Sequence, residues 1–426
     1  MPIMKILTYV SRIIVGALFT VSGLIKANDP LGFSYKLQDY FAPDVLNMDF
    51  LSPIALELAL IIAVGEIILG IATLLGSKSK ITSWALLLMI VFFTWLTFYS
   101  AYFDKVTDCG CFGDALKLTP WQSFYKDVVL LFFIAIIFIQ RKKISYNTLR
   151  ENQIILPIAI VLIAVFSMGM LDWFFPVLFI LLVSVAELIL KLFLPGEKSE
   201  NVVALIVLLG TVYFTYYTIN HLPIKDYRPY AVGKSISEQM TLPEGAKKDV
   251  YETIFYYKNL NTGEVEKFSQ DNYPWDDENY EFHDRETELI EKGDEAPIKD
   301  FIISDEYGGD VTDDILFGEG YYFLVIAYDL SKTNILGQQT VNDFALEALN
   351  AGHEFIGVSS SGGKEIEELN TKVELNYSYY SGDETMLKTI VRSNPGVILL
   401  KDGVVKGKWH FKTLPTFEEI EREVLK

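Results

Sequence analysis

The stretch that decides the fold is residues 53–76, PIALELALIIAVGEIILGIATLLG. About 20 apolar residues in a helix cross the hydrocarbon core of a bilayer, so this run predicts a membrane-spanning helix. Six more apolar runs lie around it, which predicts an α-helical membrane bundle. We expect the seven spans near residues 7–26, 53–76, 82–103, 120–140, 153–171, 174–194 and 202–219. The connection at residues 170–173 is so short that the spans beside it could instead form a hairpin that does not cross fully.

Charge divides the chain into two halves. The whole sequence has a formal net charge of −19, although 51% of it is hydrophobic. Residues 221–426 contain 21 Lys and Arg against 40 Asp and Glu, whereas residues 1–220 contain 15 of each kind. The second half therefore carries the whole negative charge. Such a surface disfavours nucleic acid as a partner, because phosphate binding needs clustered Lys and Arg.

Basic residues beside the spans predict their orientation. Lys and Arg accumulate in cytoplasmic loops, and here they fall on one side of the bundle, at Lys5, Lys78, Lys80, Arg141, Lys142, Lys143, Arg150 and Lys198. The N-terminus is then cytoplasmic, and the protein belongs in the cytoplasmic (inner) membrane. The loop before the fourth span and residues 221–426 lie on the opposite side, in the periplasm if the cell has two membranes. Since the first span holds Arg12 and ends without a small-residue cleavage site, we expect no cleaved signal peptide.

The chain has two cysteines, Cys109 and Cys111, one glycine apart in the exported loop TDCGCFG, residues 107–113. A cysteine pair in an exported, oxidising compartment can persist as a disulfide. A ring this small is strained and gains little from loop closure, which favours a disulfide that is exchanged over one that stabilises the fold. Two alternatives remain, a static local disulfide and half of a metal site. Because the four histidines are too scattered to complete a zinc spacing, we expect no metal.

Ionisable residues inside the spans are the other candidates. Glu66 lies near the middle of its span, where a carboxylate is by default a functional group with a partner or a proton path. The alternative is a buried carboxyl that is kept neutral or hydrogen-bonded between closely packed helices, for which Gly65 and Gly70 leave room. Glu57 is nine residues away and falls on the opposite helix face. Asp127, in the fourth span, either faces the cysteine loop or pairs with the preceding lysine, and we favour the pairing.

These features together resemble a known family. The first four spans, Gly65-Glu66 and the Cys109–Gly113 loop are similar to the DoxX-like membrane proteins, and especially to the related methylamine-utilisation MauE group, over about residues 5–145. The resemblance implies a four-helix membrane domain at residues 1–145, with three further spans in residues 146–220.

The MauE likeness also implies a role in disulfide formation or thiol redox on the outer side of the inner membrane. Cys109 and Cys111 would be the catalytic pair. Glu66 and Asp127 would form an intramembrane proton or quinone site. No cofactor is certain from the sequence, and quinone is the one that the likeness allows.

Residues 221–292 read as an exported connector. A segment with two prolines, 221–233, follows the last span, and residues 250–268 alternate apolar and polar across Asn261-Thr262-Gly263, which predicts a β-hairpin. The acidic stretch 271–300 lacks such a pattern, so we expect it to be irregular.

Residues 293–426 predict an exported α/β domain with a mixed sheet. Strands are expected near 321–328, 354–359, 396–400 and 404–409, and helices near 337–351, 363–370, 383–391 and 415–425. The order resembles a thioredoxin-like domain with Ala296–Phe301 as its first strand. Asn394 and Pro395 stand where that fold has its cis-proline and would border a partner-binding groove. The position of the thioredoxin cysteines holds Asp329–Asn334 instead, so the domain has no nucleophile for exchange.

The whole chain resembles a larger fused DoxX protein of Bacteroidota. Two interpretations of its function follow, from different classes of protein. In the first, the protein is a thiol-disulfide oxidoreductase, or takes part in the maturation of exported proteins, through Cys109 and Cys111. In the second, it is a membrane scaffold or assembly factor whose acidic half recruits exported proteins. Both have the lipid bilayer and exported proteins as partners. Transport of a small molecule, suggested by Glu66 alone, is disfavoured because the spans show no clear inverted repeat.

Overall fold

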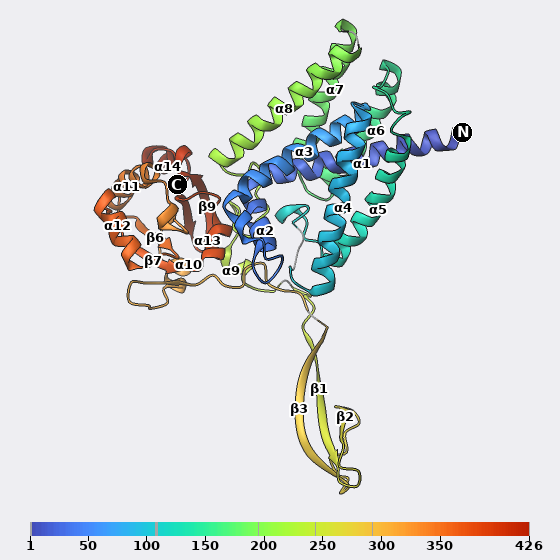
Figure 1. Ribbon diagram of the computed structural model, residues 1–426. Helices are drawn as coiled ribbons and strands as arrows, with labels where there is room; N and C mark the ends of the chain where they lie inside the picture. Colours follow the sequence, from blue (N-terminus) through green and yellow to red (C-terminus); the bar gives the residue numbers. More distant parts are fainter. Residues whose placement is uncertain (1, 107–109, 195, 243, 292, 426) are drawn as a thin grey trace.

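The protein has three parts, a helical bundle, an α/β domain and a long β-sheet arm (Figure 1). The structure is a computed structural model that describes residues 2–106, 110–194, 196–242, 244–291 and 293–425. The bundle and the α/β domain lie side by side, and the arm projects away from both, beyond the end of the bundle where α2 lies.

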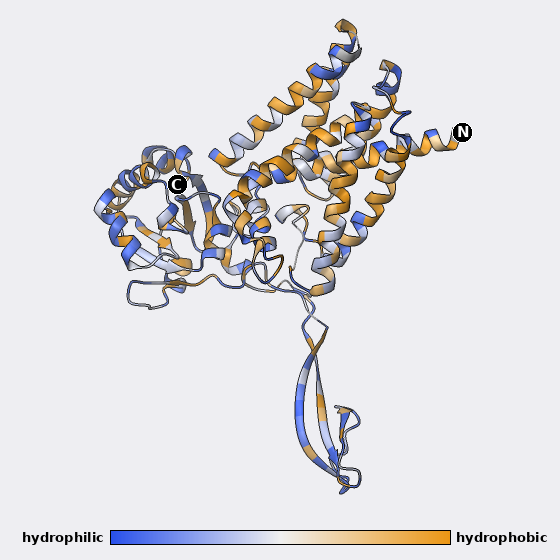
Figure 2. Ribbon diagram, in the orientation of Figure 1, coloured by the Kyte–Doolittle hydropathy of each residue, from blue (hydrophilic) through white to orange (hydrophobic). Residues whose placement is uncertain are grey.

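The bundle confirms the prediction of a multi-pass membrane protein. Within the described ranges, seven helices are long and apolar enough to cross a membrane. They are α1 (Pro2–Asn28), α3 (Ala55–Leu75), α4 (Ser79–Phe103), α5 (Pro120–Gln140), α6 (Leu149–Gly169), α7 (Phe175–Phe193) and α8 (Gly196–Asn220). Apolar residues dominate all of them, in contrast to the rest of the chain (Figure 2). The helices on either side of residues 170–173 are both long enough to span, so a partly inserted hairpin is not needed there.

Close packing between α1 and α3 forms the centre of the bundle. A Cβ on Gly16 would lie 2.9 Å from the Gly70 carbonyl oxygen, and one on Gly70 would lie 2.7 Å from the Thr20 nitrogen. The expectation that Gly70 permits close helix packing is therefore confirmed. The same expectation for Gly65 is wrong, since the nearest atom to its added Cβ is 3.9 Å away, on Met89. Gly65 lies on a looser face of α3 than Gly70.

A short helix that the sequence analysis missed, α2 (Pro30–Phe41), follows α1 directly. Asp29 caps it by accepting a hydrogen bond from the Gly32 nitrogen at 2.8 Å, and Pro30 occupies the first helical position. Its apolar side chains pack against α3 and α4, in a cluster that contains Phe33, Leu37, Tyr40, Phe41, Ala55, Ala59 and Leu96. With 12 residues it is too short to register as a span. The 3₁₀ turn η1 (Asp49–Ile54) then leads into α3.

The α/β domain is built on a six-stranded sheet with the order β4-β7-β6-β5-β8-β9. The strands are β4 (Ile303–Ser304), β5 (Tyr322–Ile326), β6 (Glu354–Ser359), β7 (Tyr379–Gly382), β8 (Gly396–Lys401) and β9 (Val404–His410). Neighbours β5, β6 and β7 run parallel, whereas β4, β8 and β9 pair antiparallel. The predicted mixed sheet is confirmed.

Helices cover both faces of this sheet. Along β5, Phe323 and Val325 point to one core, and Leu324 and Ile326 point to the other, as the period of two requires. The first core is closed by α11 (Ile335–Asn350), α12 (Gly363–Val373) and α14 (Phe417–Glu423). The second is closed by α9 (Ile236–Gln239), α10 (Thr312–Phe317) and α13 (Glu384–Ile390).

Two expectations about residues 221–426 are wrong. Residues 296–301 form no strand: the strand at that edge is β4, and Ile298 and Phe301 instead enter the core as parts of an irregular segment. The acidic stretch is also not irregular throughout, because β3 (Tyr280–Glu291) pairs along β1 (Val250–Asn259). The predicted hairpin of β1 with β2 (Val265–Ser269) is confirmed. Almost all of β3 is exposed, so it lacks the alternating apolar pattern by which strands are recognised.

Candidate functional site

The cysteine loop connects α4 to α5 at the end of the bundle that faces the α/β domain. Residues 107–109, including Cys109, lie outside the described residues, and Cys111 is half-buried. The Cys111 carbonyl oxygen accepts hydrogen bonds from Lys26 Nζ at 2.9 Å and from Ser22 Oγ at 3.1 Å. The next residue, Phe112, is buried in the bundle core, with its ring centroid 5.5 Å from that of Phe166. The backbone at Cys111 is therefore fastened to the last turns of α1.

A buried ion pair holds Lys26 in place. Its Nζ lies 3.1 and 2.9 Å from the two carboxylate oxygens of Glu66 on α3, and the two side chains are only 3% and 5% exposed. Glu66 therefore has the partner that the first interpretation expects, and it is also hydrogen-bonded between two helices, as the alternative allows. Glu57 is exposed, as its place on the opposite helix face predicts. The sequence analysis missed Lys26 and Ser22, because a lysine in the last turn of a span ordinarily extends to the membrane interface and so gives no signal of a buried partner.

A small cavity brings three of the predicted site residues together. Cys111, Glu66 and Asp127 all line a space of about 40 Å³ between α1, α3, α4, α5 and the loop. Asp127 pairs with Lys126 at 2.6 Å and accepts from Thr97 at 3.1 Å. The favoured pairing of Asp127 with the preceding lysine is therefore present, and Asp127 faces the loop as well. The space is polar on the side of Glu66 and Asp127 and apolar on the side of Leu18, Phe19 and Ile90.

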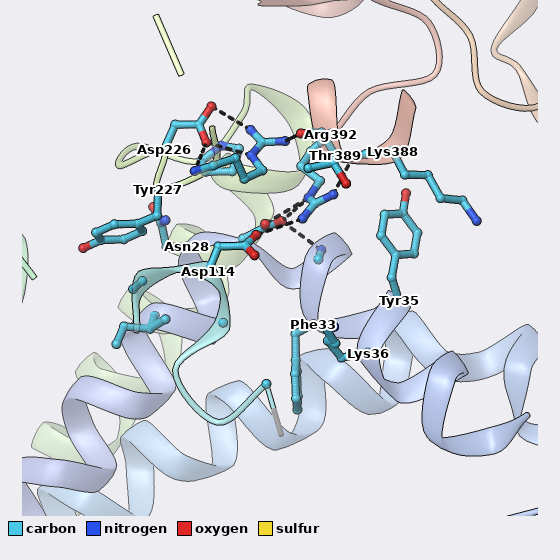
Figure 3. Close-up of a pocket in the computed structure, with 18 of the residues that line it drawn as sticks. Asn28, Phe33, Tyr35, Lys36, Asp114, Asp226, Tyr227, Lys388, Thr389 and Arg392 are labelled. Atoms are coloured by element: carbon cyan, nitrogen blue, oxygen red, sulfur yellow. Dashed lines mark hydrogen bonds and ion pairs between the residues drawn. The ribbon is translucent and has the colours of Figure 1, made fainter. Parts of the chain in front are cut away.

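Arg392 joins the α/β domain to this end of the bundle. The residue follows α13, and its Nε lies 3.0 and 2.9 Å from the two carboxylate oxygens of Asp29, the residue that caps α2. Its Nη2 lies 3.3 Å from Asp114 in the cysteine loop. Burial disfavours the charge, but Asp29 and Asp114 outweigh it and raise the pKa of the Arg392 guanidinium. Figure 3 shows Arg392 reaching from the α/β domain toward Asp114.

A second polar cluster anchors the connector to the α/β domain. Asp226 accepts from Arg228 at 2.7 Å and from Lys408 on β9 at 2.9 Å. Burial opposes ionisation of Asp226, yet the charges of Arg228 and Lys408 prevail and hold its pKa well below the usual range. The hydroxyl groups of Tyr35 on α2 and of Tyr328 lie 3.2 Å apart.

The predicted groove residues Asn394 and Pro395 lie at the start of β8. The Asn394–Pro395 peptide bond is cis. Asn394 is half-buried and donates from Nδ2 to the Asp329 carbonyl at 2.8 Å, whereas Pro395 is buried. The larger cavity at the domain interface is lined by Arg392 and not by these two residues. The sequence analysis missed Arg392, Asp29 and Asp114, which bring the domain to the loop.

The bundle is similar to a known protein family. Residues 4–140, from α1 to the end of α5, match the family model of the methylamine utilisation protein MauE. The candidate residues Lys26, Glu66, Cys109, Cys111 and Asp127 all lie within this match. Residues 251–292 match a second model, described as Domain of unknown function (DUF8463), and the described residues 251–291 of this range lie in the arm.

Among individual proteins, the chain is similar to Protein TlpB of Flavobacterium psychrophilum. The two are 26% identical over 176 residues, which cover 39% of this chain and 44% of the relative. The chain thus matches less than half the length of that relative. No solved structure matches the chain.

Proposed function

We propose that this protein is a thiol-disulfide exchange protein of the cytoplasmic (inner) membrane that acts on exported proteins through Cys109 and Cys111. The observation that carries the proposal is the buried Lys26–Glu66 ion pair, because its lysine also donates a hydrogen bond to the Cys111 carbonyl oxygen from inside the bundle. A buried ion pair is expensive to desolvate and seldom justified by stability alone. Here the ion pair positions the loop that holds both of the chain's cysteines. This favours a chemical role for that loop. The MauE match over residues 4–140 supports the same proposal.

One round of exchange needs only two reactants, the Cys109–Cys111 disulfide and a dithiol of an exported protein. A thiolate of an exported dithiol attacks the Cys109–Cys111 disulfide, which breaks that bond and forms a mixed disulfide. The second thiolate of the exported protein then attacks the mixed disulfide and releases the loop. Two electrons and two protons have passed to Cys109 and Cys111, which become thiols, while the exported protein gains a disulfide. No step of this exchange is assigned to Glu66, Asp127 or a quinone.

The α/β domain has a positioning role in this proposal. It resembles a thioredoxin-like domain in the order of its elements, but cysteine is absent from residues 293–426 and it supplies no nucleophile. Arg392 ties it to the cysteine loop through Asp114. The domain therefore holds an exported partner beside the loop, and the chemistry takes place in the MauE-like bundle.

Mass spectrometry after alkylation tests the exchange. The purified protein is mixed with a synthetic dithiol peptide, and we expect Cys109 and Cys111 to become alkylated as the peptide gains its disulfide. The variant Lys26→Met should slow this transfer, because the loop is released from α1. Peptide oxidation that is equally fast with Cys109→Ser/Cys111→Ser protein, or a pair that never reacts, would overturn the proposal.

The orientation in the membrane has its own test, since the chain has only two cysteines. A membrane-impermeant maleimide added to reduced, intact spheroplasts should label them. A matched control combines Cys109→Ser/Cys111→Ser with Lys142→Cys, which places one cysteine in the loop predicted to be cytoplasmic. That control should react only after the membrane is permeabilised. The reverse pattern would place the loop in the cytoplasm.

A second candidate function is that of a scaffold, and the arm favours it. The arm, residues 250–291, carries 12 acidic and 3 basic residues and projects from the rest of the molecule (Figure 1). Such an extended, charged surface suits recruitment of exported proteins. Under this function, deletion of the arm abolishes the cellular phenotype, and Cys109→Ser/Cys111→Ser leaves it intact. Thiol exchange predicts that the cysteine substitutions alone abolish it.

A further inference from the structure

The interface between the bundle and the α/β domain encloses a cavity of about 350 Å³. Its walls come from the end of α1 and from α2, from the cysteine loop, from the connector and from α13 (Figure 3). Gly110 and Gly113, which flank Cys111 and Phe112, form part of the wall. A volume of this size lies at the small end of ligand-binding pockets, so it suits a short segment of chain and not a folded surface.

The cavity is basic in a protein that is otherwise strongly acidic. Its lining holds seven basic residues, Lys26, Lys36, Lys117, Lys225, Arg228, Lys388 and Arg392, against four acidic residues, Asp29, Asp39, Asp114 and Asp226. The chain as a whole has a net charge of −19. A local reversal of charge in a concave site raises the local concentration of anions.

Two of these lysines are available to a ligand. Lys225 pairs with Asp172, whose side chain is 97% exposed, and Lys388 pairs with Glu384, whose side chain is 47% exposed. Ion pairs with such solvent-exposed acids are weak. A carboxylate that enters the cavity can therefore replace either acid at little cost. The arginines differ, because Arg228 and Arg392 are buried against Asp226, Asp29 and Asp114 and form the rigid wall.

We propose that this cavity binds an acidic peptide segment, one with Asp or Glu beside the cysteine that is to be exchanged. The proposal rests on the proposed function, since it names the class of exported substrate that the cysteine loop receives. Lys225 and Lys388 bind the carboxylates of the segment from two sides. Because Gly110 of the cysteine loop lines the cavity, a peptide bound there has its own cysteine next to that loop.

Binding can be measured without any thiol chemistry. The Cys109→Ser/Cys111→Ser protein in detergent is titrated with a short peptide that has Ser in place of Cys between Asp residues, followed by fluorescence anisotropy. We expect saturable binding that weakens as salt is raised, because the lysines are partly solvent-exposed. The same peptide with Asn in place of Asp should bind about tenfold or more weakly, as expected when several charge contacts are lost together. Equal binding of the two peptides, or no binding of either, overturns the proposal.

Matched lysine variants locate the site. Lys388→Gln and Lys225→Gln should each weaken binding of the acidic peptide about threefold, which is the scale of one screened charge contact. The control is Lys364→Gln, on α12 of the same domain, because Lys364 also pairs with a glutamate four residues away but lies outside the cavity lining. This control should bind like the parent. If all three variants bind alike, the peptide does not occupy the cavity.

Two further outcomes separate this proposal from others. A soluble short-chain phosphatidylglycerol that binds in place of the acidic peptide, with the same lysine dependence, overturns the proposal and makes the cavity a lipid headgroup site. Since the assay uses protein without cysteines, failure of thiol exchange does not affect it. Conversely, exchange that proceeds equally with acidic and neutral dithiol peptides leaves the proposed function standing and removes this inference.

Discussion

Lys26 is the residue on which the candidate site depends, because its ammonium contacts both Glu66 and the Cys111 backbone. Removal of one partner from a buried ion pair leaves the other charge uncompensated, which costs about 3–5 kcal/mol. We therefore expect Lys26→Met and Glu66→Leu each to destabilise the bundle on that scale, as measured by thermal unfolding in detergent. The double variant should recover most of the loss, since neither charge is then left alone. Additive losses in the double variant would contradict direct pairing.

His410, at the end of β9, makes stability depend on pH. Its Nδ1 accepts a hydrogen bond from the Lys412 nitrogen at 3.1 Å, which requires a neutral ring on that side. Burial, with the charges of Lys412 and His221, lowers the pKa of His410 from 6.5 to about 4. Between these values the unfolded chain binds more protons, so stability falls as pH drops from about 7 toward 4. His410→Asn keeps an acceptor and does not titrate, so its unfolding profile should be flatter over this range. Parallel profiles would contradict this assignment.

At the scale of elements, α2 depends on Asp29 for two separate interactions. The carboxylate caps the helix through the Gly32 nitrogen and also pairs with Arg392. Asp29→Asn keeps a good cap and loses the ion pair, whereas Asp29→Ala loses both, and a cap is worth about 1 kcal/mol. Hydrogen exchange should therefore show α2 protected in Asp29→Asn and less protected in Asp29→Ala. Equal exchange in the two variants would mean that α2 is held by its packing alone.

The arm is held together by its own aromatic side chains. Tyr257 on β1 is 8% exposed, and its ring packs near Phe268, Phe282 and Tyr273. Tyr257→Ala should lower the free energy of local unfolding of the arm, by at most about 3–5 kcal/mol, the value typical for loss of a large buried aromatic side chain. The membrane bundle should be unchanged. Hydrogen exchange over residues 250–291 measures this. Trp275→Ala is the control, because Trp275 is 72% exposed and should have no effect.

At the scale of the whole molecule, Arg392 decides whether the two large parts stay together. Arg392→Ala leaves Asp29 and Asp114 without their shared cation, so we expect the α/β domain to separate more often and the connector at residues 221–233 to be cleaved faster by protease. Arg392→Lys should act in the same direction but less strongly, since one ammonium does not reach both carboxylates in the same geometry. Arg422→Ala is the control, because Arg422 is an exposed arginine of the same domain that pairs with Glu423. Equal cleavage of all three variants would show that other contacts hold the interface.

The sequence by itself determined the membrane bundle, the cysteine loop between its third and fourth spans and the mixed sheet. Each of these depends on residues close together in the chain: a bilayer demands an apolar run of fixed length, and a strand or helix shows its own period. The hairpin of β1 and β2 was predictable for the same reason, because its turn is local. β3 was not, since its acidic, exposed residues form a strand only through pairing with β1.

Only the tertiary structure decided what surrounds the cysteines. Lys26 and Glu66 are 40 residues apart in the sequence, and Arg392 is 363 residues from Asp29 and 278 from Asp114. Charged residues of this kind carry no periodic signal, and which of them meet depends on how the helices and the α/β domain pack. Glu66 and Asp127 were recognisable as intramembrane charges, but their place in one cavity with Cys111 follows from the packing of α1, α3, α4 and α5. The chain specifies its elements locally, whereas it specifies the site through contacts between residues that are remote in sequence.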